Sequence, residues 1–76
     1  MLVTLNDVLL DAKKNKYAVG LFNTVDLEMA KGVLAAAEEL RSPVIIGSAE
    51  CLLCYSELED LADMLLPMAK KATVPV

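Results

Sequence analysis

The sequence predicts an α/β fold in which short buried strands alternate with amphipathic helices around a parallel sheet. Three stretches of the chain carry apolar residues three and four positions apart, which is the spacing of one helical face. Two short and almost continuously apolar runs lie between them, as expected for strands that are covered on both faces. Helices and strands that alternate in this way are typical of βαβ units.

The first helical pattern runs from about Leu5 to Asn15. Thr4 is expected to cap this helix, and Asp7, three residues later, completes a weaker form of the capping box. Lysines at the end of the pattern suit the negative end of the helix dipole. The apolar face consists of Leu5, Val8, Leu9 and Ala12.

The first strand and the helix after it form the first predicted βα unit. The apolar run Tyr17–Phe22 is expected to be a strand buried on both faces. A helix is predicted from Leu27 to Arg41, with either Asp26 or Thr24 as its cap. Ser42-Pro43 should end this helix, because the residue before a proline avoids the helical region.

A second unit of the same kind follows. Val44–Ile46 is β-branched and apolar throughout, which favours a strand. Ser56–Glu59 has the form of a capping box and should begin a helix that continues to about Thr73. Pro67 falls within this helix and is expected to kink or divide it. Val74–Val76 is expected to open a third strand.

The composition indicates surfaces that are meant to be covered. The chain has 76 residues, enough for one small domain, and 57% of them are hydrophobic. Globular chains usually contain roughly 45–50% apolar residues, even with glycine included. We therefore expect apolar faces that meet the rest of a larger domain or a partner; the alternative is an unusually apolar small protein.

Charge and hydropathy argue against two classes of partner. The net charge is −4 and the basic residues form no patch, so no nucleic-acid interface is predicted. No apolar stretch approaches the roughly 20 residues of a membrane-spanning helix, so no membrane partner is predicted either. The N-terminus lacks the basic region of a signal peptide, and the expected location is cytoplasmic.

Cys51 and Cys54 form the one local motif of reactive residues. Half of a zinc site needs two further ligands, and the chain has no other cysteine and no histidine. A redox pair is possible, although redox motifs usually begin a helix. Because two leucines separate the cysteines, a semi-buried structural turn is the main interpretation. The absence of histidine also excludes a Ser-His or Cys-His catalytic pair within these residues.

Asn23 and Ser48 each follow the end of a predicted strand. In βα barrels the carboxyl ends of the strands carry the active site. Both side chains can donate hydrogen bonds to a phosphate group. They are therefore candidate substrate-binding residues, with turn or cap duty as the alternative.

A collinear series of short stretches, spread along nearly the whole chain, resembles the beginning of the class II fructose-bisphosphate aldolases. No single stretch is decisive, and the order in which they occur carries the resemblance. The stretches are residues 1–3, 9–12, 17–20, 22–23, 27–30, 36–40, 42–47 and 68–76.

The fold of that family implies a partial (β/α)₈ TIM barrel for this chain. Within one domain, the resemblance implies an N-terminal helix over residues 1–16 and βα units over 17–41 and 42–73. Residues 74–76 would then be the start of the third strand. A complete barrel of this type needs about 250 residues, so the chain is expected to be an N-terminal fragment.

The resemblance also implies an activity for the whole protein. The family's enzymes reversibly cleave fructose 1,6-bisphosphate or a related ketose bisphosphate into dihydroxyacetone phosphate and an aldehyde. A zinc ion polarises the ketone as a Lewis acid. The family's first zinc-binding histidine and its catalytic aspartate belong to a motif that would follow Val76. The isolated chain is therefore expected to bind no metal and to be inactive, whereas the whole protein would be a cytoplasmic lyase of glycolysis or related sugar metabolism.

Two positions receive a role from the resemblance. Asn23 matches the asparagine after the first strand that faces the substrate near a phosphate. The family's phosphate-contacting serine aligns with Ala49, and Ser48 lies next to it. This departure, and an unusual stretch at 51–55, leave the identity of the sugar open. The remaining alternatives are a self-associating interaction module and a thiol redox protein that uses Cys51 and Cys54.

Overall fold

The computed structural model describes residues 1–76 as an α/β structure with three α-helices and two parallel strands, in the predicted order. A short 3₁₀ helix, η1, follows the second strand. The elements are α1 (Leu5–Asn15), β1 (Leu21–Asn23), α2 (Leu27–Leu40), β2 (Ile45–Gly47), η1 (Glu50–Leu52) and α3 (Leu58–Lys71).

Helix α1 begins with the predicted capping box. The Asp7 backbone N–H donates to Thr4 Oγ1 at 3.2 Å, and the Thr4 backbone N–H donates to Asp7 Oδ2 at 3.1 Å. Bonds from the Thr4 hydroxyl and from the Thr4 backbone hold the pKa of the Asp7 carboxyl below its usual value. Val8 and Ala12, from the predicted apolar face, are the buried residues of this helix.

Only one of the two predicted capping residues caps helix α2. The Met29 backbone N–H donates to Asp26 Oδ1 at 2.8 Å, so Asp26 caps the helix and Thr24 does not. Three residues of the predicted stripe are buried, namely Ala30, Leu34 and Ala37. The helix ends at Leu40, one residue before the predicted end, and Arg41 adopts the left-handed conformation with φ of 52°.

The prediction that Ser56 caps α3 is wrong. The capping residue is Glu57, and its side chain makes no capping hydrogen bond. Because the helix starts at Leu58, Ser56 lies one residue too early to reach the third helical N–H. Glu59 and Asp60 stabilise the first turn instead, through their interaction with the helix dipole.

Pro67 does not divide α3, which continues as one helix to Lys71, two residues before the predicted end. The proline is exposed, so water can satisfy the carbonyl that loses its helical partner. None of the helices combines the length and the apolarity needed to cross a membrane.

Strands β1 and β2 form a parallel pair in which Leu21 lies opposite Ile45 and Asn23 opposite Gly47. The first strand therefore starts later than predicted, since Tyr17–Val19 have no ladder partner. The pairing begins where the Ile45 N–H donates to the Gly20 carbonyl at 2.9 Å.

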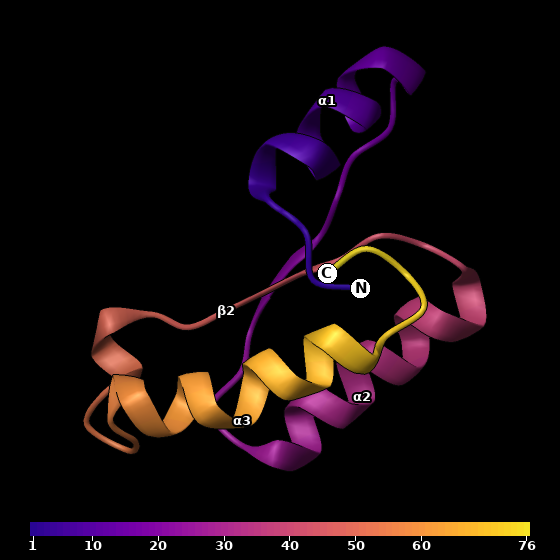
Figure 1. Ribbon diagram of the computed structural model, residues 1–76. Coiled ribbons are helices and arrows are strands. Elements are labelled where there is room, and N and C mark those ends of the chain that lie inside the picture. Colours follow the sequence, from indigo (N-terminus) through magenta and orange to yellow (C-terminus); the bar gives the residue numbers. More distant parts are fainter.

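The chain end lies on the other side of β2. The Val44 N–H donates to the Pro75 carbonyl at 3.1 Å, and the Val76 N–H donates to the Met1 carbonyl at 2.9 Å. Figure 1 shows the two termini side by side as a result. This extended segment is not itself a strand of the sheet, so a third strand remains a prediction.

Helices α2 and α3 lie together on one side of the strands, whereas α1 projects away from them (Figure 1). The core forms where α2, the start of β2 and the end of the chain meet. Its buried members are Leu34, Ala37, Val44 and Val74, with Val33, Ile46, Met68, Ala72 and Val76 packed against them.

The core is small for the length of the chain. Only 10 of 76 residues are buried, and the accessible surface is 5346 Å², against about 4,500 Å² expected for a folded monomer of this mass. Leu21 is 58% exposed and Phe22 50% exposed. The expectation that the first strand is buried on both faces is therefore wrong for this chain, because α2 and α3 cover one side only.

Glu38 joins α2 to the segment after α3. Its Oε1 accepts a hydrogen bond of 2.6 Å from the Thr73 backbone N–H, and its Oε2 accepts one from the Thr73 hydroxyl. The bond from the hydroxyl and then the bond from the N–H lower the pKa of the Glu38 carboxyl. The ionised form thus holds the two segments together, although they are 35 residues apart.

We predict that Glu38→Gln lowers stability near neutral pH and flattens its loss in acid. The pKa of Glu38 is lower in the folded chain than its ordinary value of 4.5. The ionised carboxyl therefore stabilises the fold at pH values above 4.5, and this contribution is lost as the pH falls through the pKa of the folded chain. Urea unfolding at about pH 7 and about pH 3 measures both effects. The matched control is Glu39→Gln, at an exposed neighbour. Equal pH dependence of the two variants would show that the Thr73 contact contributes nothing.

Candidate functional site

The parallel register places the carboxyl ends of β1 and β2 at the same edge of the sheet. Asn23 lies opposite Gly47, and the next N–H, that of Thr24, donates to the Gly47 carbonyl at 2.8 Å. Ser48 follows Gly47 directly. The structure therefore brings both predicted site residues to one edge, and both are exposed there.

Asn23 lies on the face of the sheet that α2 does not cover. Its Oδ1 is 3.3 Å from the position that a Cβ at Gly47 would occupy, and Leu21 Cδ2 is equally close. Leu21 and Asn23 share a face because side chains alternate along a strand. Phe22 points the other way and lines a hollow together with Val33 and other residues of α2.

Ser48 lies in the loop between β2 and η1. The register fixes the edge on which this residue lies, and the exposed hydroxyl is accessible from solvent. Its contact with a phosphate stays a prediction, as does the contact of Asn23.

Thr24 is a further polar residue at this edge of the sheet. The sequence indicated only a possible use as a helix cap. Its side chain is fully buried, and Oγ1 has no hydrogen-bond partner. Buried polar atoms are nearly always paired, so an unpaired hydroxyl next to Asn23 is unusual. The sequence gives no sign of this, because a threonine after a strand looks like an ordinary turn or cap residue.

We predict that Thr24→Val raises the free energy of unfolding by about 1 kcal/mol. An unpaired buried hydroxyl costs about 1–3 kcal/mol, and valine has nearly the same shape without that cost. Chemical denaturation measures the change, with Thr73→Val as a control at an exposed threonine whose hydroxyl is bonded. A loss of stability in Thr24→Val would mean that the hydroxyl has a partner.

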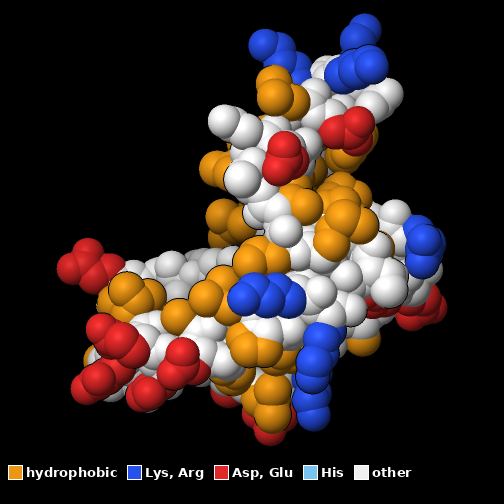
Figure 2. Space-filling view, in the orientation of Figure 1, with side chains coloured by type: hydrophobic (Ala, Val, Ile, Leu, Met, Phe, Trp, Pro, Cys, Tyr) orange, Lys and Arg blue, Asp and Glu red, His pale blue; other side chains and the backbone are white.

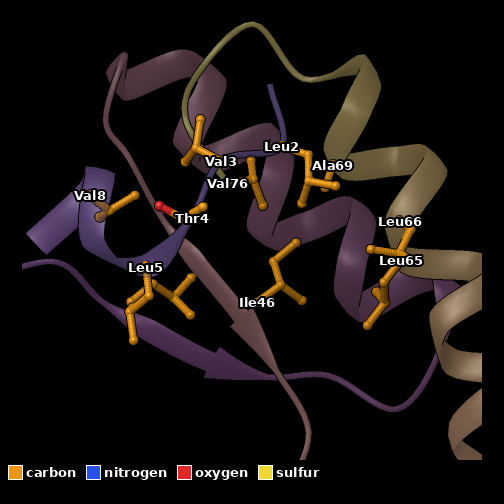
Figure 3. A pocket seen from close by; sticks show the side chains of 11 residues that line it. Leu2, Val3, Thr4, Leu5, Val8, Ile46, Leu65, Leu66, Ala69 and Val76 are labelled. Carbon is orange, nitrogen blue, oxygen red and sulfur yellow. The ribbon is translucent and has the colours of Figure 1, made fainter.

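The hollows of this structure lie away from the strand ends. A groove of about 210 Å³ is bounded by the N-terminal segment, the first turn of α1, β2 and α3. Figure 3 shows that Val3, Ile46 and Leu65 line it. A second hollow, of about 410 Å³, lies against α2 and includes Phe22. Neither is lined by Asn23 or Ser48, and both are mainly apolar. They are uncovered packing surfaces rather than polar binding sites.

The chain offers no set of ligands for a metal ion. No group of three or more histidine, cysteine, aspartate or glutamate side chains is placed to hold one. Cys51 and Cys54 are free and exposed, while the leucines between them are half-buried. The half-buried leucines agree with the predicted semi-buried structural turn, whereas the two thiols are exposed to solvent.

We predict different effects of alanine at two glycines. A Cβ at Gly47 would lie 3.3 Å from Asn23 Oδ1 and Leu21 Cδ2, so Gly47→Ala should shift the Asn23 side-chain amide resonances as these exposed side chains move aside. A Cβ at Gly32, within α2, meets nothing within 4 Å, so Gly32→Ala should stabilise the helix by about 0.5–1 kcal/mol. Amide NMR spectra and denaturation of both variants test this. Unchanged Asn23 resonances in Gly47→Ala would contradict the described contact.

Three comparisons with known proteins agree on the family. The family model for "Fructose-bisphosphate aldolase class-II" matches residues 3–76. Over 76 residues the chain is 41% identical to the fructose-bisphosphate aldolase of Thermus caldophilus, covering 100% of this chain and 25% of that protein. It is 46% identical over 66 residues to the uncharacterized protein YdjI of Escherichia coli K12, covering 87% of this chain and 24% of that one.

A solved structure is similar over the whole chain. The X-ray structure of the YdjI aldolase from Escherichia coli K12 superposes with a TM-score of 0.94 at 42% sequence identity, covering 100% of this chain and 30% of that one. The chain therefore belongs to the class II fructose-bisphosphate aldolase family. It spans about a quarter of the length of the curated relatives it matches.

Proposed function

We propose that this chain is the N-terminal part of a (β/α)₈ barrel that acts as a class II ketose-bisphosphate aldolase. The proposed parts are a helix over residues 1–16, βα units over 17–41 and 42–73, and the start of a third strand at 74–76. The observation that supports this most is the likeness to the YdjI aldolase structure across every element of the chain. The uncovered apolar faces support it as well, because further barrel segments would cover them.

The proposed reaction of the whole protein is the reversible cleavage of a ketose 1,6-bisphosphate to dihydroxyacetone phosphate and an aldehyde, within glycolysis or related sugar metabolism. Relatives that carry the name fructose-bisphosphate aldolase make fructose 1,6-bisphosphate the first substrate to test. The unusual sequence at 51–55, in the loop after β2, leaves room for a different sugar.

Asn23 and Ser48 are proposed to bind a phosphate of the substrate. Both are exposed at the edge where β1 and β2 end, and their side chains carry N–H and O–H donors. Asn23 lies on the face away from α2, which would be the inner face of a barrel whose helices form the outer ring.

The zinc ion of the family does not fit the residues of this chain. The chain has no histidine, and no cluster of ligands forms. In the proposed whole protein the ion would be held by residues outside these 76, and it would polarise the ketone there. We therefore propose that the isolated chain is inactive.

A self-associating module is the second candidate. Large apolar side chains such as Leu40 and Tyr55 are 75% and 76% exposed, and the outer edge of β1 is unpaired. Unpaired strand edges and bare apolar surface both favour association between copies.

We predict that the chain restores activity when it replaces the matching 76 residues of the Thermus caldophilus aldolase. Asn23→Ala in this chimera should lower kcat/KM for fructose 1,6-bisphosphate by about 10- to 100-fold, since a hydrogen bond to a charged group is worth about 1.5–3 kcal/mol. Ser48→Ala should have an effect in the same direction. The matched controls are Asn6→Ala and Ser56→Ala, which lie away from the strand ends.

An active chimera in which Asn23→Ala and Asn6→Ala behave alike would overturn the assignment of Asn23. A chimera that folds but cleaves no ketose bisphosphate would overturn the proposed reaction. Cleavage by the isolated chain with zinc would contradict its proposed inactivity. A stable oligomer of the isolated chain with cooperative melting would favour the interaction module instead.

A further inference from the structure

The loop between β2 and α3 carries a pair of thiols that the aldolase proposal does not use. Cys51 and Cys54 are three residues apart, and both are free and exposed. They lie within or next to η1, a few residues after Ser48.

The backbone of this loop turns with a period of three residues. The Leu52 N–H donates to the Ala49 carbonyl at 2.9 Å, and the Leu53 N–H donates to the Glu50 carbonyl at 3.1 Å. After Leu53 the 3₁₀ pattern is interrupted at Cys54, and the next bond of this kind runs from the Tyr55 N–H to the Leu52 carbonyl at 3.1 Å. Cys51 therefore lies within η1, and Cys54 follows three residues later in the turn that ends it.

One contact brings the two cysteines together. The Cys54 thiol donates to the Cys51 carbonyl at 3.3 Å, so Cys54 Sγ lies against the backbone of the residue that carries the other thiol. Leu52 and Leu53, between the cysteines, are half-buried, whereas both cysteines are exposed. The turn therefore presents both thiols to solvent, with one of them bonded to the backbone of the other cysteine.

The geometry points to a reversible dithiol–disulfide site at Cys51 and Cys54, which locks the loop after β2 when it is oxidised. The oxidant is a low-molecular-weight disulfide such as oxidised glutathione. One cysteine thiolate attacks a sulfur of the small disulfide, forming a mixed disulfide and releasing one small thiolate. The second cysteine thiolate attacks the cysteine Sγ of this mixed disulfide, forming the Cys51–Cys54 bond and releasing the second small thiolate. The two protons lost by the cysteines end on the two small thiols.

A zinc site does not explain the two cysteines, because two thiols without a third ligand cannot form a closed zinc site.

The surroundings of the two cysteines are acidic. Figure 2, with Figure 1 as a guide, shows acidic side chains gathered at the end of the molecule where the loop between β2 and α3 lies. Glu50 and Glu57 flank the two cysteines in the sequence.

Oxidation should restrict the turn that follows Ser48. A bond between Cys51 and Cys54 closes a ring of four residues, so residues 51–54 lose conformational freedom. This inference concerns the chain itself and stands or falls independently of the proposed aldol reaction.

The test is a thiol–disulfide equilibrium of the 76-residue chain in about 0.1 mM reduced glutathione, with oxidised glutathione as the oxidant, and mass spectrometry of acid-quenched samples. In urea the two cysteines are joined by a flexible linker with a roughly millimolar effective concentration, so the intramolecular disulfide should exceed the mixed disulfide by about tenfold. In the folded chain this ratio should be about tenfold higher, because the folded turn preorganises the two thiols. Cys51→Ser and Cys54→Ser are the matched controls and should form mixed disulfides only.

Repeating the measurement in the aldolase chimera keeps the proposal testable if the isolated chain is unstable. Amide hydrogen exchange over residues 49–55 should slow by about tenfold on oxidation, and treatment of Cys54→Ser should not slow it. Equal disulfide equilibria in folded and urea-treated chimera would overturn the proposal. Mixed disulfides or disulfides between chains as the main products would overturn it as well.

Discussion

The parallel pairing of β1 with β2 is the interaction on which the rest of this structure depends. It sets Asn23 opposite Gly47 and brings the ends of both strands to one edge. The strands of a parallel sheet are apolar on both faces, so such a sheet is stable when other segments cover both faces from water. Here α2 and α3 cover one side, so the other side and the outer edge of β1 remain exposed. The candidate binding residue Asn23 lies on that uncovered side.

Much of the fold follows from local sequence signals. The capping residues Thr4 and Asp26 and the apolar faces of α1 and α2 are set within a few turns of chain, so periodicity and cap chemistry predict them. The predicted start of β1 at Tyr17 was wrong. A strand needs a partner, and the pairing with β2 begins only at Leu21. The Ser56 cap was wrong for a smaller reason, a shift of the helix start by one residue.

The candidate site was predictable only in part. A polar residue after an apolar strand singled out Asn23 and Ser48, and their common edge follows from the parallel topology. The buried hydroxyl of Thr24 and the close approach of Asn23 to Gly47 depend on packing and register, which a single sequence does not contain. The hydrogen bonds between Glu38 and Thr73 join residues 35 positions apart, and they could not be predicted for the same reason.

The proposed barrel would explain why so apolar a chain has so small a core. Residues that are exposed here, such as Leu21 and Phe22, are accounted for if the remaining parts of a barrel cover them. The proposed role of Asn23 depends on the same barrel. The face of the sheet that carries Asn23 becomes an inner face only when a barrel closes around it. The thiol pair in the loop after β2 does not depend on this claim.

Amide hydrogen exchange of β1 and β2 tests the claim most directly, measured in the isolated monomeric chain and in the aldolase chimera. We expect the strand amides to be weakly protected in the isolated chain and to rank among the most protected amides in the chimera, because the other segments of the aldolase would complete the sheet there. Strand amides of the isolated monomer that are as well protected as those of the chimera would contradict it. The sheet would then be complete without any further segment.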